Sequence, residues 1–158
     1  MNANRSIQII DRKKNIFKLS QGEYIAVEKV ESIYLNSHLV NEIFVHGDSF
    51  QNYLVAIVCP NLEAIQDLCK KIGLKETNLE IVLKEKEVKE AVLKELTQVG
   101  KEGKLVGFEI IKNIYLEKES FLNKGILTTT FKVKRHEARI YYQKEIEDFY
   151  KEGVCKFQ

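Results

Sequence analysis

A run of seven consecutive apolar or aromatic residues at positions 53–59 (YLVAIVC), followed at once by the chain's single proline, constrains the fold most strongly. Such a run is typical of a strand that is buried on both faces of a sheet. A second β-branched and aromatic run, 42–47, precedes it across a short polar turn. We therefore expect a hairpin with a buried second strand, which Pro60 ends and after which Asn61 caps a helix.

Apolar residues at helical spacing predict the remaining elements. Helices are expected at 27–36, from Asn61 to Gly73, at 79–98 and at 135–150, and a third strand at about 110–116. The buried stripes are expected to be Leu62, Ile65, Leu68, Cys69 and Ile72 in the second helix, and Ile140, Ile146, Phe149 and Tyr150 in the last. Gly100, Gly103 and Gly107 are expected to loosen the chain before the third strand. Residues 7–19 predict two extended segments around a charged turn at 11–15, with another turn at 20–22. These elements indicate one α+β or mixed α/β domain.

Charge is distributed unevenly along the chain. The net charge is +2, but residues 1–20 carry five basic groups and one acid, and residues 124–144 carry six basic groups and one acid. The rest of the chain therefore carries −7. Two basic clusters on an acidic body favour a focused anionic ligand, and the alternative is that both are solvated surfaces of a lysine-rich protein.

Cysteine spacing and the absence of common motifs exclude several classes. The cysteines Cys59, Cys69 and Cys155 form no Cys-x-x-Cys pair and lie near no histidine at zinc spacing, which predicts reduced thiols and no metal site. No apolar run reaches the ~18 residues of a membrane-spanning helix. The chain also lacks a phosphate loop, a dinucleotide-binding motif and a nucleophile elbow, so it does not look like a complete enzyme.

Two segments are unusual for a scaffold: 11–24 (DRKKNIFKLSQGEY) and 127–135 (LTTTFKVKR). In the second, Lys132 and Lys134 lie on one side of an extended segment. A threonine-rich turn that presents a lysine just before a helix can hold that cation at an anionic ligand. For Lys134 and Arg135, the alternative is a solvated helix start.

These two segments carry a specific resemblance. Residues 11–31 (DRKKNIFKLSQGEYIAVEKVE) resemble the hinge and following loop of long-chain fatty acyl-CoA synthetases, and LTTTFKVKR resembles the C-terminal lysine motif of these adenylate-forming enzymes. The resemblance covers nearly the whole chain. It implies that 1–158 is a single C-terminal lid domain, α+β, with a small mixed sheet flanked by helices and an N-terminal two-stranded hairpin. It also implies a hinge region at 9–15, a helical insertion at 75–103 and a large N-terminal domain that this sequence lacks.

The resemblance also implies roles for individual residues. Lys132 matches the adenylation lysine, and Lys18 with the loop Ser20, Gln21, Gly22 and Glu23 matches the side that serves the thioester step. Arg12, with Asp11 beside it, matches the nucleotide contact, and Lys14 matches the hinge pivot. The chain departs from many relatives at Val27 and Thr129, where they have proline.

The implied function is that of an AMP-forming, ATP-dependent long-chain fatty acid:CoA ligase, of which this fragment is expected to be inactive alone. ATP, Mg²⁺ and CoA would be bound mainly by the other domain, and none tightly by this one. The expected partners are that N-terminal domain, fatty acid, ATP and CoA, without nucleic acid. The expected location is the cytoplasm or the cytosolic face of a membrane, with any peripheral membrane association made through the rest of the protein.

Two alternatives stay open. One is a non-catalytic domain that binds RNA or an anionic membrane through its basic clusters; the other is a ligase for a different carboxylic acid. Against RNA, the basic clusters lack an interleaved aromatic platform on which bases could stack, because Phe17 and Phe131 fit strand-core positions as well. Against a membrane, the 135–150 helix carries charges of both signs.

Overall fold

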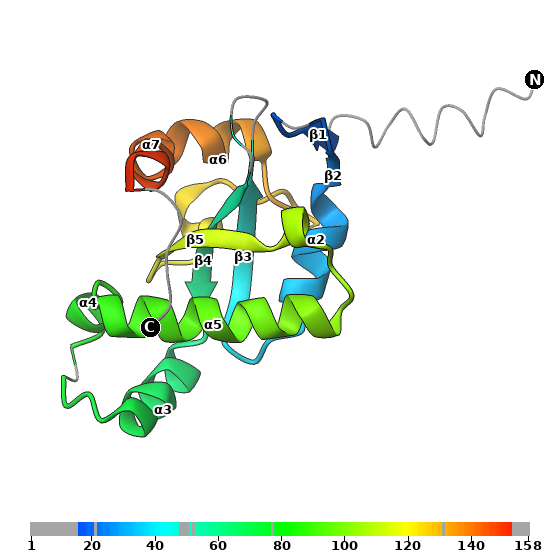
Figure 1. The fold of residues 1–158 in the computed structure, drawn as a ribbon. Coiled ribbons are helices and arrows are strands. Elements are labelled where there is room, and N and C mark those ends of the chain that lie inside the picture. Colours follow the sequence, from blue (N-terminus) through cyan, green and yellow to red (C-terminus); the bar gives the residue numbers. More distant parts are fainter. Residues whose placement is uncertain are drawn as a thin grey trace, which may run out of the picture.

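A three-stranded mixed sheet forms the centre of the computed structural model, which describes residues 16–20, 22–47, 51, 53–76, 78–130 and 132–152. Its strands are β3 (Val40–His46), β4 (Leu54–Pro60) and β5 (Ile111–Leu116). β4 lies in the middle, antiparallel to β3 and parallel to β5 (Figure 1). All seven residues of β4 are buried. The predicted hairpin and its buried second strand are therefore confirmed.

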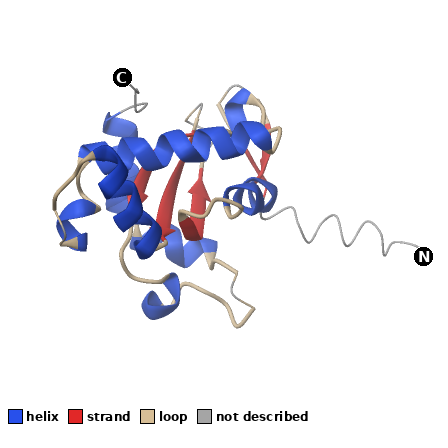
Figure 2. Ribbon diagram, turned by 90° about the horizontal axis from the view of Figure 1, so that it is seen from below, coloured by secondary structure: helices blue, strands red, loops and turns tan. Residues whose placement is uncertain are grey.

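Helices cover both faces of this sheet. One face carries α2 (Val27–Tyr34), α3 (Leu62–Ile72), the short α4 (Leu79–Val82) and the long α5 (Lys86–Glu102), which lies across the strands in Figure 2. The other face carries a 3₁₀ turn, η2 (Phe121–Lys124), and the helices α6 (Arg135–Tyr141) and α7 (Gln143–Glu152). A second 3₁₀ turn, η1 (Gly107–Glu109), leads into β5. A parallel neighbour such as β5 requires a long crossover, and α3 to α5 supply it.

A separate two-stranded hairpin stands at the start of α2 (Figure 1). It pairs β1 (Ile16–Lys18) with β2 (Tyr24–Ala26), and β2 runs directly into α2. The predicted N-terminal hairpin is therefore present, but it turns at residues 19–23, and 24–26 was not expected as a strand. The charged turn expected at 11–15 lies outside the described residues.

The predicted boundaries of α3 are confirmed by its caps. The side-chain oxygen of Asn61 accepts a hydrogen bond from the backbone N–H of Ala64 at 3.2 Å. Gly73 follows the helix with φ +78°, a left-handed conformation that glycine adopts without steric cost. The expected burial of Cys69 is also confirmed, whereas that of Ile72 is wrong, since its side chain is 38% exposed. Ile65 and Cys69 are buried, and Leu62 and Leu68 are partly buried and pack against the same core, so the predicted stripe is confirmed except at Ile72.

The expected helix at 135–150 is divided in two at Tyr142, which leaves helical geometry with φ −103° and ψ 19°. The break changes which residues face the sheet. Ala138 and Tyr142 are buried beside Phe149, whereas Ile140 is 61% exposed, so its predicted burial is wrong. The expected helix at 79–98 is likewise divided into α4 and α5.

The expectation that Gly100 loosens the chain is also wrong. Gly100 is a buried residue of α5. A Cβ atom built there would lie 2.8 Å from Cδ1 of Ile110 and 3.2 Å from the hydroxyl of Tyr34. Glycine therefore permits α5 to pack closely against the chain entering β5 and against α2.

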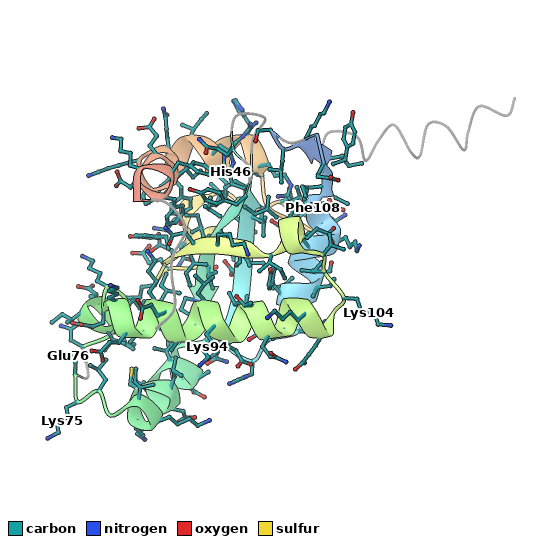
Figure 3. The ribbon with its side chains drawn as sticks, in the orientation of Figure 1. His46, Lys75, Glu76, Lys94, Lys104 and Phe108 are labelled. Carbon is teal, nitrogen blue, oxygen red and sulfur yellow. The ribbon has the colours of Figure 1, made fainter. Side chains whose placement is uncertain are left out.

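The long helix α5 is amphipathic. It supplies Val88, Val92, Leu93 and Leu96 to the core, whereas Lys94 points away from the sheet in Figure 3. Lys75 and Lys104, in flanking segments, also project outward in that view.

That 75–103 is an insertion relative to other enzymes stays a prediction. No helix in the described part of the chain is both long and apolar enough to cross a bilayer.

Candidate functional site

The segment that carries Lys132 is a closed loop, which we call the lysine loop (residues 127–133). Leu127 and Val133 form an antiparallel bridge at its base. Inside this bridge, the backbone N–H of Thr128 donates to the carbonyl oxygen of Lys132 at 2.7 Å. Just outside it, the N–H of Lys134 donates to the carbonyl of Ile126 at 2.7 Å, directly before α6. The backbone of Lys132 is therefore held by Thr128 on one side and lies shortly before the start of α6 on the other.

The side chain of Thr128 closes the lysine loop from within. Its Oγ1 accepts hydrogen bonds from the N–H of Lys132 at 3.0 Å and from the N–H of Thr130 at 3.3 Å. The hydroxyls of Thr128 and Thr130 lie 3.0 Å apart and share a further hydrogen bond. Four donor or acceptor groups of the turn are thus satisfied within the loop, without help from the rest of the protein.

The side chain of Lys132 itself is exposed. Among the described residues, no carboxylate lies within ion-pair distance of its ammonium group. Lys132 and Lys134 are both exposed and Val133 between them is half-buried, which agrees with the predicted alternation. Phe131, expected beside Val133, lies outside the described residues. Lys132 is therefore an exposed cation without an ion pair to another described residue, and its backbone is hydrogen-bonded to Thr128.

Arg135, the first residue of α6, is anchored to α2 by an ion pair. Its guanidinium donates to both carboxylate oxygens of Glu31, with Nη1 3.0 Å from Oε2. The backbone N–H of Val45 in β3 donates to the same Oε2 at 2.8 Å. Burial raises the pKa of Glu31, whereas the hydrogen bonds and charge of Arg135 lower it. This pair fastens the end of the lysine loop to the helix that follows the hairpin.

The residues beside the lysine loop do not form a phosphate pocket. A cavity of about 460 Å³ between α2, β3 and the lysine loop is lined by Lys132 and Arg135, but also by Glu28, Glu31 and Glu42. Three carboxylates in the lining disfavour a bound phosphate. The described residues also contain no cluster of three His, Cys, Asp or Glu side chains that could hold a metal ion. An anion at Lys132 would therefore need most of its ligands from elsewhere.

The hairpin loop (residues 19–23) presents the second group of predicted site residues. The N–H of Leu19 donates to the carbonyl of Glu23 at 2.8 Å, and the N–H of Gly22 donates to that of Leu19 at 2.9 Å. Gly22 has φ +93°, a conformation that side chains rarely adopt. The N–H of Ser20 donates to the carbonyl of Gln51 at 2.9 Å, which ties the loop to the segment before β4. Ser20, Gly22 and Glu23 are all exposed on this tight turn.

Lys18 lies at the end of β1, directly opposite Tyr24 of β2. Its ammonium nitrogen is 5.6 Å from the centre of the Tyr24 ring, and both side chains are exposed. Among the described residues, this cation–π contact is its main charge interaction, and no carboxylate pairs with it. Lys18 is therefore an exposed cation without an ion pair to another described residue.

The two loops share one attachment, the helix α2. The hairpin leads into its first residue, Val27, and the lysine loop is fastened to Glu31 by Arg135. No direct contact joins Lys18 to Lys132 in the described part of the structure. The predicted site residues thus fall into two groups, each on its own loop. Asp11, Arg12, Lys14 and Gln21 lie outside the described residues, so their predicted roles stay predictions.

Part of the C-terminal basic cluster is neutralised within the protein. Arg135 pairs with Glu31, and the ammonium of Lys124 lies 3.7 Å from a carboxylate oxygen of Glu117 and 3.6 Å from one of Glu119. These pairs reduce the charge available to a diffuse polyanion such as RNA or an anionic membrane. Lys132 and Lys134 are exposed, and neither makes an ion pair with another described residue.

Sequence analysis missed two residues that shape this site, Glu31 and Thr128. Glu31 lies on the apolar stripe of α2 with Val27, Val30 and Tyr34, all of which are buried. An acid in that stripe is a signal for a buried partner, because an unpaired buried carboxylate is costly. Thr128 had a weaker signal, since three adjacent threonines do not indicate which hydroxyl turns inward.

Comparison with known proteins supports the resemblance found in the sequence. Human long-chain-fatty-acid–CoA ligase 1 is 46% identical to the chain over 148 residues, which is 93% of the chain and 21% of the ligase. The chain therefore spans 21% of that relative's length. No family model matches the chain.

Two solved structures extend the similarity to the fold. The adenylation domain of a carboxylate reductase from Mycobacterium chelonae has 32% identity and a TM-score of 0.73, over 87% of this chain and 19% of that one. The A domain of a carboxylic acid reductase from Segniliparus rugosus, in complex with AMP and a co-purified carboxylic acid, has 33% identity and a TM-score of 0.72, over 89% and 20%. The predicted α+β fold is confirmed. The resemblance is confirmed too: the chain is similar to the C-terminal domain of long-chain-fatty-acid–CoA ligases.

Proposed function

We propose that this chain is the mobile lid domain of an AMP-forming long-chain fatty acid:CoA ligase. Lys132 serves acyl-adenylate formation, and Lys18 with the hairpin loop serves the thioester step. The observation that carries the proposal is Lys132 itself, an exposed ammonium without an ion pair among the described residues, on a backbone held by the lysine loop. The similarity to a ligase that acts on long-chain fatty acids supports the choice of substrate.

In the first half-reaction, a carboxylate oxygen of the fatty acid attacks the α-phosphorus of Mg-ATP, and pyrophosphate leaves. Negative charge accumulates between the carboxylate and the α-phosphate in the transition state. The ammonium of Lys132 stabilises that charge when the lid closes over the substrates. Because the backbone of Lys132 is already hydrogen-bonded to Thr128, little reorganisation is needed at that moment. The AMP and carboxylic acid bound in the Segniliparus rugosus A domain are compatible with these substrates.

In the second half-reaction, the thiol of coenzyme A attacks the acyl carbonyl, which yields acyl-CoA, AMP and a proton. The hairpin loop is the surface that faces coenzyme A. Lys18 offers an exposed cation to the anionic cofactor, and Gly22 lets the backbone approach its pantetheine arm because no Cβ intervenes. The two loops are separate, which supports their use at different steps.

The chain acts together with the N-terminal domain of its own ligase. That domain binds Mg-ATP, the fatty acid and most of coenzyme A. The three carboxylates that line the cavity beside Lys132 support this for the phosphates, because they disfavour a bound anion there. The isolated chain is accordingly inactive. Buried, unpaired thiols at Cys59 and Cys69 support a reducing setting, the cytoplasm or the cytosolic face of a membrane.

The test is the substitution Lys132→Ala in the full-length ligase, with Lys134→Ala as the matched control. Both lysines are exposed, and both are within the segment 127–135. We expect Lys132→Ala to lower the rate of pyrophosphate exchange, which reports adenylation, by about 10²–10³-fold. Lys134→Ala should stay within about threefold, as expected for a solvated charge. Equal small effects of both substitutions would contradict the proposed role of Lys132.

A further inference from the structure

We infer that Thr128 is a positioning residue for Lys132, an inference that rests on the function proposed above. Thr128 contacts Lys132 at both backbone polar groups: its N–H donates to the carbonyl of Lys132, and its Oγ1 accepts from the N–H of Lys132. The side chain of Thr128 is uncharged, so it does not itself stabilise the negative charge on the proposed substrates. Thr128 acts through Lys132, by fixing the direction in which that side chain leaves the loop.

The hydroxyl of Thr128, rather than that of Thr129 or Thr130, holds the backbone of the lysine loop. Its Oγ1 binds the N–H groups of Lys132 and Thr130, and it lies 3.0 Å from the hydroxyl of Thr130. Thr129 and Thr130 are exposed, whereas Thr128 is half-buried. Without this oxygen, both N–H groups would turn to water. The turn would then keep only its backbone hydrogen bonds and the bridge between Leu127 and Val133.

The position of the backbone matters because the lysine side chain is long. A small rotation at Lys132 moves the ammonium group by a larger distance, and a misplacement of about 1 Å can cost about 10²-fold in rate. The backbone at Thr129 is not constrained by a ring, since this residue is not proline. The hydroxyl of Thr128 supplies the constraint instead, through hydrogen bonds rather than covalent geometry.

The test uses the full-length ligase with three substitutions. Thr128→Val removes the hydroxyl at nearly constant shape, Thr128→Ser retains it, and Thr129→Val changes a neighbouring exposed threonine in the same way. We expect Thr128→Val to lower kcat for adenylation by about 10- to 100-fold, with KM for ATP and fatty acid within about twofold. Thr128→Ser should restore the rate to within about threefold of the wild type, and Thr129→Val should leave it unchanged.

Three results would overturn the positioning role. They are a Thr128→Val rate within twofold of the wild type, an equal loss in Thr129→Val, or an equal loss in thioester formation from supplied acyl-adenylate. The last result would mean that the substitution damages the domain as a whole. Lys132→Ala measured in parallel separates the two proposals. If Lys132→Ala lowers adenylation by about 10²–10³-fold while Thr128→Val stays within twofold of the wild type, only the positioning role fails. If Lys132→Ala has no effect, the proposed function itself fails.

Discussion

Glu31 carries a carboxylate into the layer between α2 and the sheet, where only 7% of its surface is exposed. Burial favours the protonated form, but the guanidinium of Arg135 and the N–H of Val45 stabilise the charged one. Removal of either partner of a buried ion pair is costly, because the remaining charge has lost its compensation. This pair is therefore the residue-scale connection that holds the lysine loop on the body of the domain.

The substitution Arg135→Met should reduce the free energy of unfolding by about 2–3 kcal/mol at pH 7, less than the about 3–5 of a fully buried pair. The expected loss is smaller than for a fully buried pair because the arginine side chain is 19% exposed. The pKa of Glu31 is raised in the folded state and rises further without Arg135, so folding of the variant favours the protonated acid. Its stability deficit should therefore shrink as the pH falls towards 4.5, the ordinary value for this group. Urea unfolding of both proteins at several pH values measures this.

The double variant Glu31→Gln with Arg135→Met provides the control. Without a carboxylate at position 31, the loss of stability caused by Arg135→Met should no longer depend on pH. A deficit in Arg135→Met that grows towards acid pH would contradict the account, because it would mean that the ionised form of Glu31 does not cause the loss.

At this scale, sequence reasoning found the exposed cations but not their supports. Lys132 and Lys18 were assigned through the resemblance of short segments around them. Glu31 and Arg135 are 104 positions apart, and no local pattern indicates that they meet. The hydrogen bonds of Thr128 are local, but they depend on a turn whose geometry the sequence alone does not reveal.

At the scale of elements, local signals predicted strands, caps and most helices. The apolar run 53–59 predicted β4, and Asn61 and Gly73 predicted both ends of α3. The break at Tyr142 was missed because residues on both sides have good helical patterns, and tertiary packing decides where the chain changes direction. The role of Gly100 was missed because close packing against a distant segment leaves no mark in the local sequence.

Gly100 supplies a prediction in which packing opposes helix propensity. In an exposed helix, replacing glycine by alanine stabilises by roughly 0.5–1 kcal/mol. Here the new Cβ would lie 2.8 Å from Ile110 and 3.2 Å from the hydroxyl of Tyr34, which also accepts a hydrogen bond from the N–H of Ile111 at 3.1 Å. We expect Gly100→Ala to reduce the free energy of unfolding by about 1–3 kcal/mol, because overpacking outweighs the gain in propensity.

Lys94→Ala, on the exposed side of the same helix, is the matched control (Figure 3). Its free energy of unfolding should stay within about 0.5 kcal/mol of the wild type. Urea denaturation measures both variants. A Gly100→Ala protein more stable than the wild type would show that α5 does not pack as closely as described.

At the scale of the whole molecule, α2 links the two loops that carry the proposed chemistry. The hairpin joins its first residue through the backbone, and the lysine loop joins it through the ion pair of Glu31 and Arg135. The domain therefore presents two separate cationic sites on one body. A rigid-body rotation of such a domain can bring first one site and then the other to a substrate held by a partner domain.

The most direct measurement compares Lys18→Ala and Lys132→Ala in the full-length ligase, with each half-reaction assayed separately. Lys132→Ala should lose adenylation by about 10²–10³-fold and retain thioester formation from supplied acyl-adenylate. Lys18→Ala should show the reverse pattern, with a loss of at least about tenfold in thioester formation and little change in adenylation. Equal losses in both half-reactions for either variant would contradict the account of two sites that act at different steps.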